Sequence, residues 1–131
     1  MQDPAHLLPT VPNQPVVLVV DDEVLIVNIA RIALESDGLF VLTAEDGQDA
    51  LELSRRFPGS IHLLVSDVVM PKMNGLELRE RISAERPATK VLLMSGLVDS
   101  SIADCPFLQK PFHISALKER VRRLLALRAS E

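Results

Sequence analysis

The feature that most constrains the fold is a short apolar run that ends in an acid and a turn. The run begins at Ile61 and ends at Asp67, and Pro71 and Gly75 mark the turn that follows. It is too short for a buried helix, so it predicts a central strand of a parallel sheet. Asp67 stands at the carboxyl end of that strand. Because ligands bind beyond the carboxyl ends of the strands in open parallel sheets, this position predicts a functional role for Asp67.

A second strand with an acidic end comes earlier in the chain. Residues 16–20 form a run rich in β-branched side chains, and Asp21, Asp22 and Glu23 follow directly. Hydrophobic patterning with Gly and Pro stop signals predicts further strands at 39–44, 90–95 and 107–109, and helices at 24–36, 48–57, 76–86 and 114–125. Strands that alternate with helices predict an α/β fold with a doubly wound, five-stranded parallel sheet.

The length of the chain fits one domain. Its 131 residues can bury a core without disulfide staples. Residues 1–15 contain four prolines among small and polar residues, a composition that disfavours helix and sheet alike. We interpret residues 1–15 as a flexible Pro-rich tail and residues 16–131 as the domain.

Composition argues against several classes of function. The formal net charge of −4 argues against general nucleic-acid binding. No apolar run is long enough to cross a bilayer and no leader pattern begins the chain, so we expect no membrane interaction. The one cysteine, Cys105, cannot form an internal disulfide and fits a reducing compartment. Together these features predict a cytoplasmic protein.

Polar side chains lie at the ends of four predicted strands. Asp21 with Asp22, Asp67, Ser95 and Lys110 occupy these positions, and a parallel sheet brings its carboxyl ends to one edge. Three carboxylates there repel each other, and Mg²⁺, a hard cation with oxygen ligands, would relieve the repulsion. Ser95 and Lys110 suit phosphoryl oxygens, one as a neutral donor and one as a positive charge. Asp67 is then the candidate nucleophile that takes a phosphoryl group as an acyl phosphate.

These residues carry a resemblance to a known family. From about Val16 to Ala129 the chain resembles the receiver domain of two-component response regulators, which has a flavodoxin-like fold of the chemotaxis-regulator type. The matching motifs, all in family order, are Asp21-Asp22, Asp67-x-x-Met70-Pro71-x-Met73-x-Gly75, Ser95-Gly96 and Phe107-x-x-Lys110-Pro111-Phe112.

The resemblance implies a phosphoacceptor and a metal site. By this resemblance Asp67 accepts phosphate from a phosphohistidine, so the expected partner is a histidine kinase or a histidine phosphotransfer protein. Mg²⁺ is bound by Asp22, Asp67 and the backbone carbonyl of Val69, and Asp21 holds a metal-bound water. Such a domain is not an enzyme for other substrates, since it catalyses only its own phosphorylation and dephosphorylation.

The resemblance also implies a conformational switch. Ser95 and Lys110 bind the phosphoryl group, and the bond between Lys110 and Pro111 is a cis peptide. Ser95 moves inward on phosphorylation and the ring of Phe107 follows it, which changes the outer face for an output partner that the sequence does not identify.

The chain departs from the family pattern in several places. Ser95 and Lys110 are only 15 positions apart, so the fourth helix, between the fourth and fifth strands, should be short or missing. The usual dimerisation face is then altered, and we expect a monomer or a weak dimer. Phe107 lacks the hydroxyl of the commoner tyrosine. Val69 and Leu97 are apolar and cannot orient a water, which predicts slow self-dephosphorylation.

The first and last helices carry two further hypotheses. The core stripe of the first helix is expected to consist of Leu25, Ile29, Ile32 and Ala33, which leaves the opposite face to dock a kinase or phosphotransfer helix. That docking face would consist of Val24, Val27, Asn28 and Arg31; the alternative is that these are ordinary exposed side chains. The basic last helix is interpreted as a solvated face, with no direct DNA binding.

Three other functions remain as alternatives. A pseudo-receiver scaffold would lack one of the five polar positions. All five are present in this chain, so this alternative fits poorly. A phosphatase of the haloacid dehalogenase type needs a second Asp two residues after Asp67, where this chain has Val69. A flavin-binding domain needs a phosphate-cradling loop after the first strand, where this chain has acids. The chain ends soon after the last helix, so we expect a single-domain regulator or a receiver cut from a larger protein, such as a hybrid histidine kinase.

Overall fold

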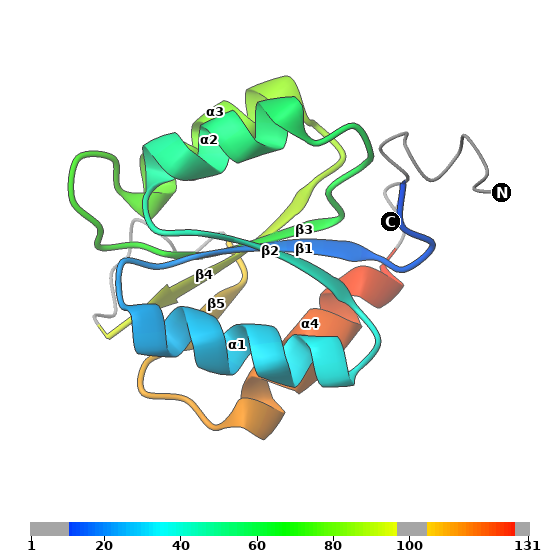
Figure 1. Ribbon diagram of the computed structural model, residues 1–131. Coiled ribbons are helices and arrows are strands. Elements are labelled where there is room, and N and C mark those ends of the chain that lie inside the picture. The colour runs from blue at the N-terminus through cyan, green and yellow to red at the C-terminus, as the bar shows by residue number, and fades with distance from the viewer. Residues whose placement is uncertain (1–10, 97–104, 128–131) are drawn as a thin grey trace, which may run out of the picture.

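The chain folds into a five-stranded sheet between two pairs of helices (Figure 1). The structure is a computed structural model, and it describes residues 11–96 and 105–127. The strands are β1 (Val16–Val20), β2 (Phe40–Ala44), β3 (Leu63–Asp67), β4 (Lys90–Ser95) and β5 (Phe107–Gln109). The helices are α1 (Val24–Ser36), α2 (Gly47–Arg56), α3 (Gly75–Glu85) and α4 (Ile114–Ala126). These bounds confirm the predicted alternation of strands and helices.

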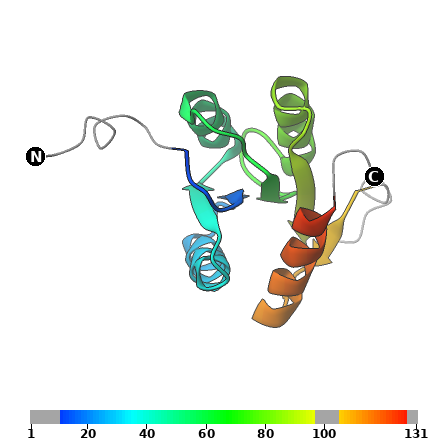
Figure 2. The same cartoon turned by 90° about the vertical axis from the view of Figure 1, so that its right-hand side faces the viewer.

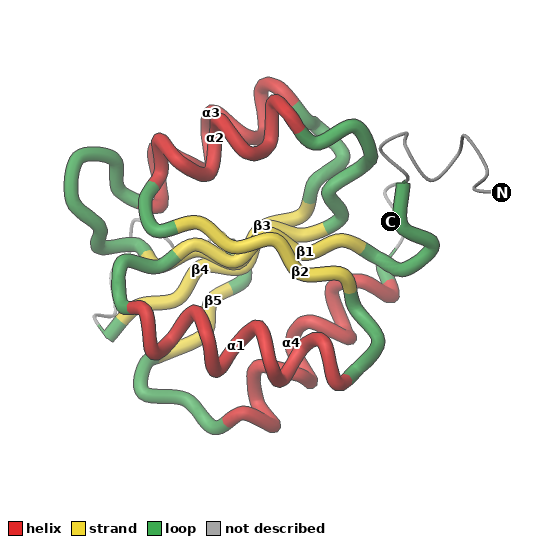
Figure 3. The backbone as a smooth tube through the Cα atoms, in the orientation of Figure 1, coloured by secondary structure: helices red, strands yellow, loops and turns green. Residues whose placement is uncertain are grey.

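All five strands are parallel, in the order β2-β1-β3-β4-β5. The tube in Figure 3 shows the strands side by side in one twisted layer. Helices α2 and α3 cover one face of the sheet, and α1 and α4 cover the other (Figures 1 and 2). The strand order reverses direction at β1, which makes the sheet doubly wound. The predicted α/β fold class is therefore confirmed.

The core consists of two layers, one on each face of the sheet. Every residue of β1 is buried, and successive side chains point to opposite faces of a strand. Accordingly, Val16 and Leu18 belong to the cluster beneath α2 and α3, and Val17 and Val19 to the cluster beneath α1 and α4. This burial on both faces explains why the strands appear in the sequence as continuous apolar runs.

Helix α1 turns a different face to the sheet from the one that its sequence predicted. Its buried side chains are Val27, Ala30, Ala33 and Leu34. Leu25 is 75% exposed, and Ile29 and Ile32 are also exposed. The predicted core stripe is therefore wrong at these three positions and right only at Ala33. Apolar residues occur on all sides of this helix, and the small alanines face the sheet because they allow the helix to approach it closely.

Two predictions fall wholly or partly outside the described part of the chain. The short or missing helix between β4 and β5 was placed on a segment that includes residues 97–104, and these are not described. The first ten residues of the Pro-rich tail are likewise not described, while residues 11–15 precede β1 without regular structure. Among the helices described, none is both long enough and apolar enough to cross a membrane.

Candidate functional site

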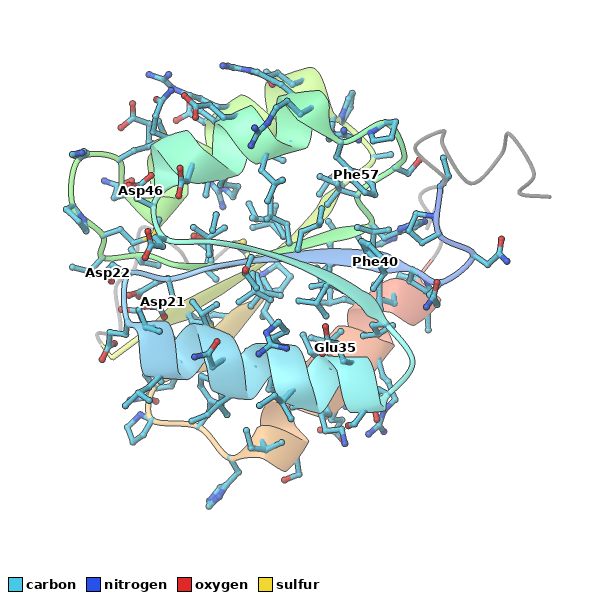
Figure 4. The ribbon with its side chains drawn as sticks, viewed as in Figure 1. Asp21, Asp22, Glu35, Phe40, Asp46 and Phe57 are labelled. Atoms are coloured by element: carbon cyan, nitrogen blue, oxygen red, sulfur yellow. The ribbon has the colours of Figure 1, made fainter. Side chains whose placement is uncertain are left out.

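The polar ends of four strands meet at one edge of the sheet, as predicted. Asp67 closes β3 and pairs in register with Met94 of β4. The backbone carbonyl of the next residue, Ser95, accepts a 2.8 Å hydrogen bond from the backbone N–H of Lys110, which follows β5. In Figure 4, Asp21 and Asp22 lie where β1 ends, at the opposite end of the sheet from the labelled Phe40 and Phe57.

Three carboxylates form a compact acidic cluster at this edge. Asp21, Asp22 and Asp67 each place one oxygen so that all three oxygens lie within 4.8 Å of one another. Asp21 and Asp67 are buried, and Asp22 is exposed. Backbone N–H groups orient the buried pair, since Glu23 donates to Asp21 Oδ1 at 2.9 Å and Val69 donates to Asp67 Oδ1 at 3.4 Å. The cluster is therefore built into the ends of β1 and β3.

Gly75, the first residue of α3, packs directly against the end of the strand that carries Asp67. A Cβ atom at position 75 would overlap the backbone carbonyl oxygen of Asp67 and would lie 2.9 Å from the Cα of Val68. The backbone N–H of Gly75 donates to the carbonyl of Val68 at 2.8 Å. A glycine is needed here because the neighbouring atoms are backbone and cannot move aside. The turn identified in the sequence thus fixes the position of Asp67.

Lys110 places its ammonium group among the acids. Its Nζ lies 2.6 Å from Asp21 Oδ2, 3.3 Å from Asp67 Oδ2 and 3.3 Å from Glu23 Oε1. The side chain of Lys110 is only 13% exposed, so it must be charge-paired to be stable there. One cation thus bridges the ends of β1 and β3 from the end of β5.

Burial and charge shift the protonation equilibria of these groups. Burial raises the pKa of Asp21 above its ordinary value, although Lys110 acts in the lowering direction. Burial, followed by the negative charge of Asp21, raises the pKa of Asp67 in the same way. Burial lowers the pKa of Lys110, but its bonds and charge interactions with Asp21, Asp67 and Glu23 outweigh that effect, and the net pKa is raised. The acids are therefore under electrostatic strain that a further positive charge would relieve.

The donor set suits a hard divalent cation. All three clustered groups are carboxylates with oxygens at mutual distances that one ion can span, and Mg²⁺ prefers oxygen ligands from one or two carboxylates together with water and phosphate. Exposed Asp22 leaves the cluster open to solvent on one side. The acidic cluster therefore suits a Mg²⁺ ion that keeps part of its coordination shell free for another ligand.

The residues predicted to act as a switch, Ser95 and Phe107, lie on the neighbouring strands β4 and β5. Ser95 is buried at the end of β4, and Phe107 is half-buried and packs against the core beneath α2 and α3. Arg120 of α4 donates a hydrogen bond to the backbone carbonyl of Phe107. The peptide bond between Lys110 and Pro111 is cis, as the family resemblance implied. Leu97 lies outside the described residues.

The predicted docking face on α1 is wrong in part. Val27 is only 9% exposed and belongs to the core, so it cannot form an exposed contact. Val24 and Asn28 are exposed, as predicted, and Arg31 is partly exposed and paired with Glu35 at 3.2 Å. The large apolar side chains that α1 does expose are Val24, Leu25, Ile29 and Ile32.

Glu23 is a site residue to which sequence reasoning gave no role. It lies in the loop between β1 and α1, and its carboxylate reaches Lys110. The sequence did show Glu23 as the third acid in a row after the first strand. The pattern of strand ends alone could not distinguish it from a solvated side chain.

Comparison with known proteins is consistent with this geometry. The sequence model of the response regulator receiver domain matches residues 17–122. The chain is 36% identical over 121 residues to the probable transcriptional regulatory protein TcrX of Mycobacterium tuberculosis, covering 86% of this chain and 51% of that protein. It is 34% identical over 116 residues to the sensor kinase CckA of Brucella abortus, covering 83% of this chain and 12% of that protein. The chain thus spans about half, or less, of these relatives.

A similar likeness holds in three dimensions. The crystal structure of the receiver domain from the hybrid histidine kinase CckA superposes with a TM-score of 0.75 at 34% sequence identity, covering 84% of this chain and 98% of that chain. The strand order, the acidic edge and the cis peptide before Pro111 are thus accompanied by likeness in both sequence and fold.

Proposed function

Because this chain belongs to the family of response regulator receiver domains of two-component systems, we propose that it is a phosphoacceptor and that Asp67 carries the phosphoryl group. One observation carries the proposal. Asp67 is buried at a strand end, with Lys110 at 3.3 Å and with Asp21 and Asp22 in the same cluster. A nucleophilic carboxylate, a cation for the incoming phosphate and a metal-binding pair of acids are thus close together.

In the proposed reaction, a carboxylate oxygen of Asp67 attacks the phosphorus of a phosphohistidine. An O–P bond forms, the P–N bond breaks, and the imidazole leaves and takes up a proton. Lys110 and the hydroxyl of Ser95 would each hold an equatorial phosphoryl oxygen, since Ser95 ends β4 and Lys110 directly follows β5 at the same edge of the sheet. Water then attacks the same phosphorus, the bond between phosphorus and the Asp67 oxygen breaks, and the free Asp67 carboxylate and inorganic phosphate are formed.

Mg²⁺ is the proposed cofactor of this step. Asp22, Asp67 and the backbone carbonyl of Val69 would hold the ion, and Asp21 would hold one of its waters. When bound, the ion supplies positive charge that offsets the repulsion between the acids and an anionic donor. Hydrogen bonds from the backbone N–H groups of Glu23 and Val69 orient the carboxylates of Asp21 and Asp67 before the ion binds.

The proposed partner is a histidine kinase or a histidine phosphotransfer protein in the cytoplasm. We assign the domain no catalytic activity toward other substrates. A phosphoester phosphatase would need an acid two residues after Asp67, and the side chain there is Val69, which is apolar and 59% exposed.

Incubation with acetyl phosphate tests the proposal without knowledge of the natural donor. Intact-mass spectrometry should show one labile phosphoryl group on the wild type with Mg²⁺, and none in the presence of a chelator. Asp67→Asn should take up none. Glu45→Gln is the matched control, since it removes an exposed acid from the loop after β2 at the same edge, and it should be phosphorylated like the wild type. Equal uptake by Asp67→Asn would overturn the assignment.

A further inference from the structure

The ammonium of Lys110 has a third carboxylate partner besides the two aspartates. Glu23 Oε1 lies 3.3 Å from Lys110 Nζ. Glu23 is also the N-cap residue of α1, but its side chain makes no capping hydrogen bond. The carboxylate is therefore turned toward Lys110 and away from the free N–H groups of the helix, where an N-cap side chain usually bonds.

Lys110 donates hydrogen bonds to Asp21 and Glu23, and its contact with Asp67 is an ion pair at 3.3 Å. An ammonium group has three N–H donors, and three carboxylates surround this one, from Asp21, Asp67 and Glu23. A phosphoryl group on Asp67 needs one of these donors. On phosphorylation the Asp67 carboxylate becomes an acyl phosphate and its contact passes to the phosphoryl group, whose larger negative charge draws the ammonium away from one of the two remaining carboxylates.

Exposure indicates which carboxylate gives way. Of the two carboxylates that remain, the side chain of Asp21 is 0% exposed, whereas that of Glu23 is 64% exposed. A buried carboxylate that loses its cation is left without compensation, while an exposed one regains water. Releasing Glu23 from Lys110 is thus less costly than releasing Asp21.

We propose that Glu23 is a competing anion that holds Lys110 in the unphosphorylated domain and is displaced by the phosphoryl group. Glu23 is a positioning residue in this scheme, because it acts only through Lys110. The inference rests on the proposed function, since it assumes that an anion comes to Asp67.

The exchange also links the site to a neighbouring groove. A groove of about 520 Å³ runs between α1 and the segment after β5, with Ile26 and Ile29 on one wall and Phe112 and Ile114 on the other. Glu23 and Lys110 both line it, and their ion pair joins the two walls. Displacement of Glu23 removes that tie, so the first turn of α1 is freed from the segment after β5 on phosphorylation.

Beryllofluoride, a stable mimic of a phosphoryl group, tests the competition directly. Binding to the wild type, Glu23→Gln and Glu45→Gln is followed by fluorine NMR at saturating Mg²⁺, with circular dichroism to check folding. Loss of an exposed competing ion pair should tighten binding by about three- to fivefold in Glu23→Gln. Glu45→Gln removes the same charge from the same edge without touching Lys110, and its affinity should stay within about 1.5-fold of wild type.

Magnesium titration by calorimetry gives a second readout without any anion. When Glu23 is removed, Lys110 binds Asp21 and Asp67 more firmly, so Mg²⁺ affinity should fall further in Glu23→Gln than in Glu45→Gln. If the two variants match in both titrations while the wild type binds beryllofluoride, the inference on Glu23 is wrong and the proposed function stands. If the wild type binds no beryllofluoride, the proposed function fails and the inference fails with it.

Discussion

At the scale of single residues, the site is built at a cost to stability. Burial raises the pKa of both Asp21 and Asp67, and one lysine is shared among three carboxylates. A raised pKa in the folded state means that the charged form is less stable there than in the unfolded chain. The charged forms of these two acids therefore lower the stability of the folded domain.

We predict that Asp67→Asn stabilises the metal-free domain at pH 7. Because the folded-state pKa of Asp67 is raised, its contribution to stability is fully present below the unfolded pKa and is lost as pH rises through the folded pKa. The gain from the variant should therefore shrink as pH is lowered through that folded pKa. Urea unfolding at a series of pH values measures it. A variant less stable than wild type at pH 7 would contradict this account.

A second prediction for a single residue concerns Val69 and the lifetime of the acyl phosphate. Its side chain is apolar and 59% exposed, two residues after the proposed acceptor, and it cannot orient an attacking water. We expect Val69→Asn to shorten the half-life, because an amide can hold that water. Decay after removal of acetyl phosphate, followed by intact mass, gives the rate. The hypothesis of slow self-dephosphorylation is untenable if the wild type decays as fast as the variant.

At the scale of elements, the sequence predicted the helices and strands well and the orientation of α1 poorly. Apart from β3, which starts at Leu63, the predicted ranges agree with the structure to within one residue at each end. Gly and Pro signals mark these ends clearly. The exposed face of α1 could not be predicted because bulky apolar residues and alanines alternate around the helix, and only tertiary packing decides which of them face the sheet.

The exposed apolar side chains of α1 give a corrected docking prediction. Leu25, at 75% exposure, should contact a helical phosphodonor if this face docks one. Leu25→Asp should then slow phosphotransfer from a phosphorylated histidine protein about tenfold, while uptake from acetyl phosphate stays unchanged. Val27→Asp is the contrasting variant, since it buries a charge and should lower stability instead. Equal slowing with both donors would argue against a docking role.

Arg86 is an element-scale feature that no sequence pattern indicated. Its guanidinium group, at the C-cap of α3, donates to Ser54 Oγ at 2.8 Å and to the carbonyls of Ser54, Phe57 and Gly59 at 2.7, 2.9 and 2.7 Å. It thereby satisfies carbonyls at the end of α2 and joins α2 to α3. The sequence around Arg86 gives no sign of these partners, because they lie 27 to 32 positions away.

We predict that Arg86→Ala lowers the free energy of unfolding by about 3 kcal/mol, because four acceptors lose a charged donor. Arg55→Ala is the matched control. It removes a surface ion pair with Glu85 in which Arg55 is 52% exposed, and it should cost about 1 kcal/mol or less. Urea denaturation of both variants distinguishes the two roles. Similar losses would mean that Arg86 is no more than a surface arginine.

At the scale of the whole molecule, the site is a product of topology. Lys110 and Asp21 are 89 positions apart and meet at 2.6 Å, because a parallel sheet brings the carboxyl ends of its strands to one edge. The meeting of Asp21, Asp67, Ser95 and Lys110 could therefore be predicted from strand ends alone. The contact between Glu23 and Lys110 could not be predicted in this way. It depends on the path of the loops after β1 and β5, which strand patterns do not specify.

The most direct test of the central claim locates the phosphoryl group chemically. Borohydride reduces an aspartyl phosphate to homoserine, so the domain is incubated with acetyl phosphate and Mg²⁺, reduced, digested and mapped by peptide mass spectrometry. We predict homoserine at position 67 alone, and none when a chelator is present. Homoserine at Asp22 or at another acid, or its absence from a wild type that gains phosphoryl mass, would contradict the assignment of Asp67 as the acceptor.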